Sequence, residues 1–97
     1  MATVMVMHWP QVTPEQYEKA RNLVGWERDV PPGARMHVAW MSGDGFRVVD
    51  VWDDPELFQN FVATRLTPGV QQIGIEGQPQ VTFHELLGAF APEAITP

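Results

Sequence analysis

The chain has 97 residues, no cysteine and a formal net charge of −6, from twelve Asp and Glu against six Lys and Arg. Without cysteine, thiolate nucleophiles, iron–sulfur clusters and cysteine-ligated zinc are excluded. The basic residues are scattered, whereas nucleic acids and anionic membranes bind to concentrated cationic surfaces, so neither is an expected partner. No apolar run approaches the roughly 18 residues of a membrane span, and no secretory signal is recognisable, so we expect a cytoplasmic protein.

The first predicted elements are a strand over residues 3–9 and a helix over about residues 14–24. The strand segment, TVMVMHW, is dominated by Val and Met without polar alternation, which is typical of a strand covered on both faces. Thr13, followed by Pro and by Gln three residues later, predicts the start of the helix. Gly25 is expected to end it, and a Pro-Pro-Gly stretch makes residues 26–35 a connector.

A hairpin and a second helix follow. β-branched and aromatic residues on either side of Asp44-Gly45 predict two strands joined by a two-residue type I′ turn. Asp54 as the N-cap predicts a helix that starts at Pro55, and Thr67-Pro68 is expected to break this helix. A last strand is predicted over about residues 80–87.

This order of elements predicts one α+β domain over residues 1–88, with residues 89–97 as a C-terminal tail or arm. Right-handed crossovers give a ferredoxin-like βαββαβ arrangement, an antiparallel sheet in the order 4-1-3-2 with two helices on one face. The strands carry few charges, and leaving an apolar sheet face in water would cost several kcal/mol. We therefore expect a homodimer through the helix-free sheet face, with Val48 among its buried residues.

The stretch RVVDVWDDPELFQNFVATRL, following PPGARMHVAW, resembles the signature of the dimeric α+β barrel superfamily. This group includes antibiotic biosynthesis monooxygenase-like and stress-responsive barrel domains. The resemblance covers residues 3–87 and implies a homodimeric α+β barrel. It implies little about function, because the superfamily hosts cofactor-free oxygenases, heme-degrading enzymes, cyclases and isomerases.

The heme-degrading members of that superfamily use an Asn on the first strand, a Trp at the end of the third strand and a His on the following helix. Trp52 matches their Trp. Residues 3–9 contain no Asn, however, and residues 55–66 contain no His. The resemblance therefore does not imply heme degradation.

Candidate site residues are expected at one end of the predicted sheet. If Asp44-Gly45 is a two-residue turn, His37 opposes Trp52 and shares a face with Asp50, whereas a three-residue loop would move His37 to the opposite face. In a mostly apolar cavity, a His and a carboxylate can act as general base and orienting partner, so the candidate catalytic residues are His37 and Asp50. The candidate ligand-binding residues are His8, Met41, Trp52 and His84.

Each of these residues also has a structural interpretation. His37 and His84 can be buried histidines bonded to backbone or to each other, and Trp52 can belong to the core. Trp26 is interpreted as a core or interface anchor. The three histidines could bind a metal together with Asp50 or Glu85, but no two of them have the i, i+2 or i, i+4 spacing that preforms a metal site. No metal and no cofactor are expected.

Two functional hypotheses remain. The first is a homodimer that binds a small hydrophobic, aromatic or polyketide-like molecule, with cofactor-independent monooxygenase or cyclase activity. The alternative is a non-catalytic dimeric binding or assembly module with an interior filled by side chains. A cavity of about 300 Å³ or more, lined by His37, Asp50 and Trp52, would favour the first hypothesis.

Overall fold

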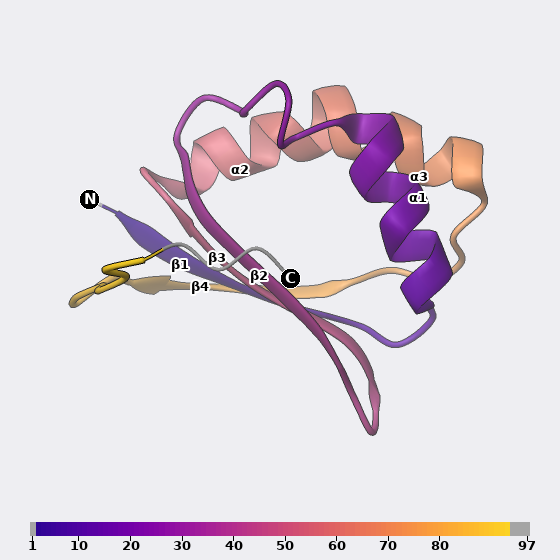
Figure 1. Ribbon diagram of the computed structural model, residues 1–97, viewed down its shortest axis with the longest axis horizontal. Coiled ribbons are helices and arrows are strands. Elements are labelled where there is room, and N and C mark those ends of the chain that lie inside the picture. Colours follow the sequence, from indigo (N-terminus) through magenta and orange to yellow (C-terminus); the bar gives the residue numbers. More distant parts are fainter. Residues whose placement is uncertain (1, 94–97) are drawn as a thin grey trace.

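The computed structural model describes residues 2–93 and contains a four-stranded sheet with helices on one side of it (Figure 1). The elements in chain order are β1 (Thr3–Trp9), α1 (Pro14–Val24), β2 (Ala34–Ser42), β3 (Gly45–Trp52), α2 (Pro55–Phe61), the π-helix η1 (Val62–Leu66), α3 (Thr67–Ile73) and β4 (Gln80–Glu85). Among the described residues, no helix is long and apolar enough to cross a membrane.

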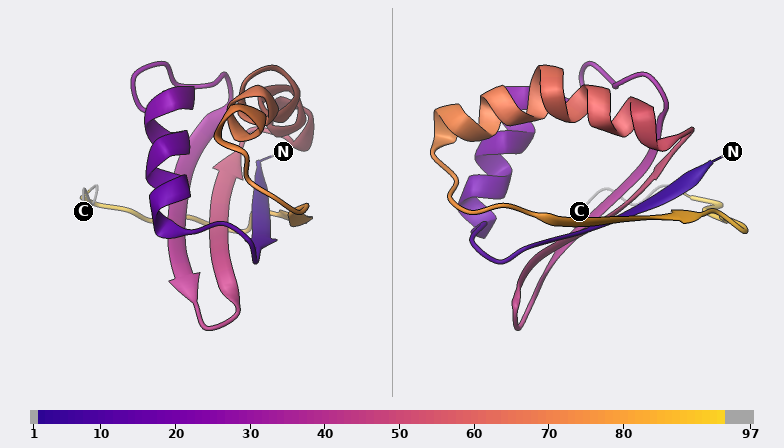
Figure 2. Two further views of the ribbon diagram at one scale, coloured as in Figure 1. Left: turned by 90° about the vertical axis from the view of Figure 1, so that its right-hand side faces the viewer. Right: turned by 180° about the vertical axis from the view of Figure 1, so that it is seen from behind.

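The strands lie in the order β2-β3-β1-β4, and every neighbouring pair is antiparallel. Figure 2 shows α1 and the α2–α3 segment packed against the same face of this sheet. The observed arrangement confirms the predicted ferredoxin-like βαββαβ fold and its 4-1-3-2 sheet order. The two central strands, β1 and β3, carry most of the buried residues.

Helix α1 begins and ends where its capping residues predict. The Thr13 hydroxyl accepts a hydrogen bond from the Gln16 backbone N–H, and the Gln16 side chain accepts one from the Thr13 backbone N–H, which completes a capping box. Gly25 ends the helix in the left-handed region, with φ 71°. This helix carries Tyr17 in its first turn.

The predicted break at Thr67-Pro68 is wrong, because the helix continues through it as one rod from α2 to α3 (Figure 1). The chain widens into the π-helix η1, where the Thr67 N–H bonds to the Val62 carbonyl five residues earlier. Pro68, which has no backbone N–H, directly follows this widened turn within the rod.

The helix-covered face of the sheet holds the core. Alternate residues of β1 and β3 point under the helices and are buried together with Phe58, Phe61 and Val70 from the rod; these strand residues are Met5, Met7, Trp9, Phe46, Val48 and Trp52. Val48, at 4% exposure, therefore lies in the core of the chain. The prediction that it lies on the dimer face is wrong, since its alternation along β3 places it on the other side.

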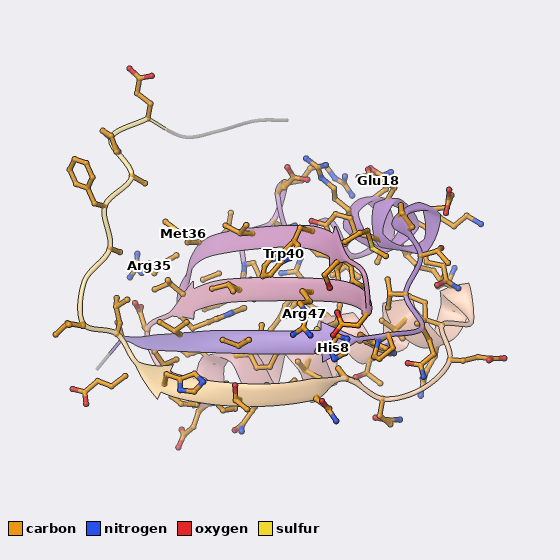
Figure 3. All side chains as sticks on the ribbon, turned by 90° about the horizontal axis from the view of Figure 1, so that it is seen from below. His8, Glu18, Arg35, Met36, Trp40 and Arg47 are labelled. Carbon is orange, nitrogen blue, oxygen red and sulfur yellow. The ribbon has the colours of Figure 1, made fainter. Side chains whose placement is uncertain are left out.

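The helix-free face, which we call the open face, is apolar as well, as the sequence predicts. Val38 pairs with Val49 at its centre, and the Val38 side chain is 49% exposed. Figure 3 looks onto this face and shows Met36 and Trp40 on it. Its apolar residues are Val4, Val6, Met36, Val38, Trp40, Val49 and Val51.

The hairpin between β2 and β3 differs in register from the prediction. Ser42 pairs with Gly45, so Gly43 and Asp44 form the turn, and His37 lies directly opposite Asp50. A type I′ turn needs a positive φ at both central residues, but Gly43 and Asp44 do not have one, and within the hairpin the positive φ, 120°, is at Gly45. The turn is therefore not the predicted type I′. The shift is two residues, and an even shift keeps His37 on the predicted face.

Beyond β4, the chain leaves the sheet with Leu87 and Phe90 almost fully exposed. The last four residues of the predicted 89–97 tail or arm lie outside the described residues.

Candidate functional site

The centre of the candidate site is a hydrogen-bonded pair formed by His37 on β2 and Asp50 on β3. The Nδ1 atom of His37 lies 2.7 Å from Oδ1 of Asp50. Trp52 donates its indole N–H to the other carboxylate oxygen at 3.0 Å. Asp50 is 6% exposed, so this carboxylate is buried with a partner on each oxygen. The structure thus brings together His37, Asp50 and Trp52 as predicted.

Tyr17 extends this pair into a longer chain of hydrogen bonds. Its hydroxyl lies 2.8 Å from Nε2 of His37, on the side of the ring away from Asp50. Burial raises the pKa of Tyr17 to about 12, so its hydroxyl is neutral and able to donate over the physiological range. The sequence marks Tyr17 only as part of the apolar side of a helix; nothing in the pattern indicates that it reaches His37.

The order of these bonds determines what the histidine can do. A carboxylate offers only acceptor atoms, so a neutral His37 carries its proton on Nδ1 and directs the Nε2 lone pair toward Tyr17. This is the tautomer that a general base requires, with a carboxylate behind the ring to stabilise the imidazolium that forms. The arrangement can therefore accept a proton at one atom, Nε2.

A cavity of about 290 Å³ lies between the sheet and the helices, and all four of these side chains line it. Its wall is otherwise almost wholly apolar and aromatic. Trp26 packs its ring edge-on to His37, with centroids 5.3 Å apart, and also contacts Tyr17. Trp26 is therefore part of the cavity wall as well as a packing residue. The volume lies at the lower end of the range for ligand sites.

Ion pairs hold the charged groups near the cavity. Arg21 on α1 binds the Glu27 carboxylate through two nitrogens, and the guanidinium holds the pKa of Glu27 below its usual range. Arg35 binds both oxygens of Asp53 at 2.8 Å and likewise lowers the pKa of that carboxyl. Glu27 and Arg35 themselves line the cavity, and each has its charge offset by its ion-pair partner.

His8, His84 and Met41 do not join the site. His8 lies on the open face, where its Nε2 is 2.8 Å from the Asp44 carbonyl oxygen (Figure 3). His84 is also on that face and bonds to Thr82 at 2.9 Å. Met41 lies near the hairpin tip, is 45% exposed and does not line the cavity. His8 and His84 miss the site because nearness along the sheet does not decide which face a side chain occupies. Met41 shares the face of His37 but lies too far toward the hairpin tip to line the cavity.

A second cavity, of about 390 Å³, lies between the α2–α3 rod and β4, and no histidine or carboxylate lines it. Within residues 2–93, no three His, Asp or Glu side chains come close enough to hold a metal ion. The chemistry of the described part of the chain is thus concentrated around His37.

No model of a protein family matches the sequence, and no curated protein matches it. Solved structures do match. A candidate antibiotic biosynthesis monooxygenase from Nitrosomonas europaea is 11% identical, with a TM-score of 0.67, and the match covers 89% of this chain and 90% of that one. SnoaB, a cofactor-independent oxygenase from Streptomyces nogalater, is 17% identical, with a TM-score of 0.62 and coverage of 95% and 97%.

A protein of unknown function from Nitrosomonas europaea also matches, at 18% identity and a TM-score of 0.62, over 96% of this chain and 95% of that one. At such low identities these matches show a shared fold. They confirm, at that level, the resemblance to antibiotic biosynthesis monooxygenase-like proteins. A shared fold does not assign a reaction, which has to be argued from the site.

Proposed function

We propose that this chain binds a small aromatic or polyketide-like molecule in the cavity between sheet and helices. We further propose that His37, oriented by Asp50, acts there as the general base of a cofactor-independent monooxygenase or cyclase. The observation that carries the proposal is the buried His37–Asp50 bond at the wall of an apolar cavity of about 290 Å³. The fold shared with SnoaB, described as a cofactor-independent oxygenase, is consistent with it.

The chemistry needs one acidic hydrogen on the ligand. His37 would take a proton from a phenol or an activated C–H through Nε2, and Asp50 would stabilise the resulting imidazolium. The apolar, aromatic wall would hold a flat ring system. The ligand carbanion could then react with dioxygen to form a hydroperoxide at that carbon, which loses water together with the second hydrogen of the carbon; one oxygen atom stays in the product as a carbonyl, the other leaves as water, and the ligand itself supplies the electrons. In a cyclase, the carbanion would instead attack a carbonyl of the same molecule to close a ring.

We also propose that the working unit is a homodimer joined through the open face. The support is the run of apolar side chains on that face, with Val38 about half exposed at its centre. Leaving such a face in water is costly for a domain of this size. The exposed Leu87 and Phe90 that follow β4 are available to the same interface.

Asp50→Asn tests the catalytic part of the proposal. With an amide in place of the carboxylate, His37 is no longer held with its proton on Nδ1, so we expect oxidation of a probe with an acidic C–H, such as anthrone, to fall by at least about tenfold. Dioxygen uptake gives the rate, and nitrogen-detected NMR of His37 gives the tautomer. Thermal unfolding must show that the variant is folded, because a disturbed buried hydrogen bond costs about 1–3 kcal/mol.

Asp44→Asn is the matched control. Asp44 is an exposed carboxylate in the hairpin turn, bound to Arg47 and Ser42, and it does not line the cavity. Its loss is expected to leave oxygen uptake unchanged. Binding of the probe without any uptake that depends on Asp50 would favour the non-catalytic binding module, and no binding at all would contradict the proposal.

A further inference from the structure

The hydroxyl of Tyr17 occupies the hydrogen-bonding position of the proposed base. Nδ1 of His37 is committed to Asp50, so Nε2 is the one ring nitrogen open to another partner, and the Tyr17 oxygen lies 2.8 Å from it. The neighbouring polar groups are also engaged: Trp52 donates to Asp50, and Glu27 is paired with Arg21. A ligand that is to bond to His37 must therefore take the place of the Tyr17 hydroxyl.

We propose that Tyr17 is an internal competitor for this site, a phenol that holds Nε2 of His37 until a ligand with an aryl hydroxyl of its own displaces it. This inference rests on the proposed function and adds the ligand class and the group with which the ligand competes. The bond broken and the bond formed are of one kind, a phenol O–H donating to Nε2, so the exchange is close to balanced. An aromatic hydrocarbon cannot make the replacement bond, so it binds with the Tyr17–His37 bond left in place.

Two features of Tyr17 suit it to this role. Burial raises the pKa of its hydroxyl to about 12, which keeps it a neutral donor like the phenol it would stand in for. Its ring packs against Trp26 and Phe46, with centroids 5.9 and 5.2 Å away, and remains only half buried. Because the hydroxyl lies on the ring axis, the whole ring must swing to release Nε2, and the half-buried ring has solvent on one side into which it can move.

The test compares two ligands of one skeleton, 2-naphthol and naphthalene, in equilibrium dialysis. Tyr17→Phe keeps the ring and removes the competing hydroxyl. We expect the preference for 2-naphthol over naphthalene, as the ratio of the two affinities, to rise by about 3- to 10-fold in this variant, the worth of one hydrogen bond. Thr82→Val is the matched control, because it removes a hydroxyl bonded to Nε2 of His84 on the open face. It should leave the ratio unchanged.

The possible outcomes separate this inference from the proposed function. If both ligands bind but Tyr17→Phe leaves the ratio within about twofold, or lowers it, the competing role of Tyr17 is overturned while binding in the cavity stands. If neither ligand binds to either form, both proposals fail. A nitrogen spectrum of His37 without ligand adds an independent check. Its Nε2 signal should move in Tyr17→Phe, and an unmoved signal would also overturn the inference.

Discussion

At the scale of single residues, Asp50 is a carboxylate in a hydrophobic core, and its surroundings explain how the fold tolerates it. An unpaired buried carboxylate would cost many kcal/mol. Here His37 and Trp52 each occupy one oxygen, and Tyr17 continues the chain of bonds toward the surface. The network thus offsets part of the cost of burying the charge and fixes the His37 ring in one orientation. Structure and proposed chemistry depend on the same bonds.

The titration of Tyr17 reports directly on this network, because Tyr17 is the only tyrosine in the chain. Burial raises its pKa from the ordinary 10 to about 12, so phenolate absorbance of the folded protein should appear near pH 12. The folded state then holds the proton more tightly than the unfolded state. Its free energy of unfolding should therefore be unaffected by this group below pH 10 and fall between pH 10 and 12.

The control for this titration is the unfolded chain. In concentrated urea, the phenolate should appear near the ordinary pKa of 10. A midpoint near 10 in the folded protein as well would mean that the Tyr17 hydroxyl lies in water, and it would remove the support for its contact with His37.

Part of this site could be predicted from the sequence. The predicted register paired His37 with Trp52, and the observed register pairs it with Asp50, two residues away. Because residues two apart on a strand share a face, either register places His37 on the face of Asp50 and Trp52. Tyr17 could not be predicted, because its contact depends on where α1 lies across the sheet. His8 and His84 lie on β1 and β4, so their face relative to Asp50 depends on the registers of those strands, which the sequence does not give.

At the scale of elements, the hairpin between β2 and β3 decides which residues meet at the site. Its register follows from Gly45, the first residue of β3 after the Gly43-Asp44 turn, which has φ 120°, rather than from an Asp44-Gly45 pair at the centre of the turn. A Cβ atom on Gly45 would lie 2.6 Å from the Cα of Pro10. Backbone conformation and close packing therefore both demand glycine there, and the sequence motif alone does not reveal which position of the turn needs it.

Two glycine substitutions test this account of the hairpin. We expect Gly45→Ala to lower the free energy of unfolding by about 1–3 kcal/mol, because alanine meets both a strained φ and the Pro10 backbone. Gly43→Ala is the control: it has a negative φ and no atom within 4 Å of an added Cβ. We expect it to change stability by less than about 0.5 kcal/mol. Urea denaturation gives both values, and equal losses would contradict the assignment.

At the scale of the whole molecule, the sheet separates two apolar layers with different roles. One layer lies under the helices and contains the core and the candidate site; the other is the open face. The topology could be predicted from the order of elements, because handedness and connection rules leave few alternatives. The predicted apolar character of both faces is also confirmed. Assigning each strand residue to one of these two layers required the pairing register of the strands, as Val48 shows.

Val38→Arg tests the proposed dimer on the open face. Val38 lies at the centre of that face and is 49% exposed in the single chain, so arginine there is compatible with a folded monomer. In a dimer the same charge would be buried without a partner, at a cost of several kcal/mol. We expect light scattering to give twice the chain mass of 10.9 kDa for the unchanged protein and the single mass for the variant.

Leu23→Arg is the control for this experiment, because Leu23 is similarly exposed, at 45%, but lies on α1 and away from the open face. It should remain a dimer. Circular dichroism must show that both variants are folded. A monodisperse monomer of the unchanged protein at micromolar concentration would rule out the dimer. A Val38→Arg variant that stays dimeric would instead place the interface elsewhere, because a closed two-fold through the open face brings its centre against the partner.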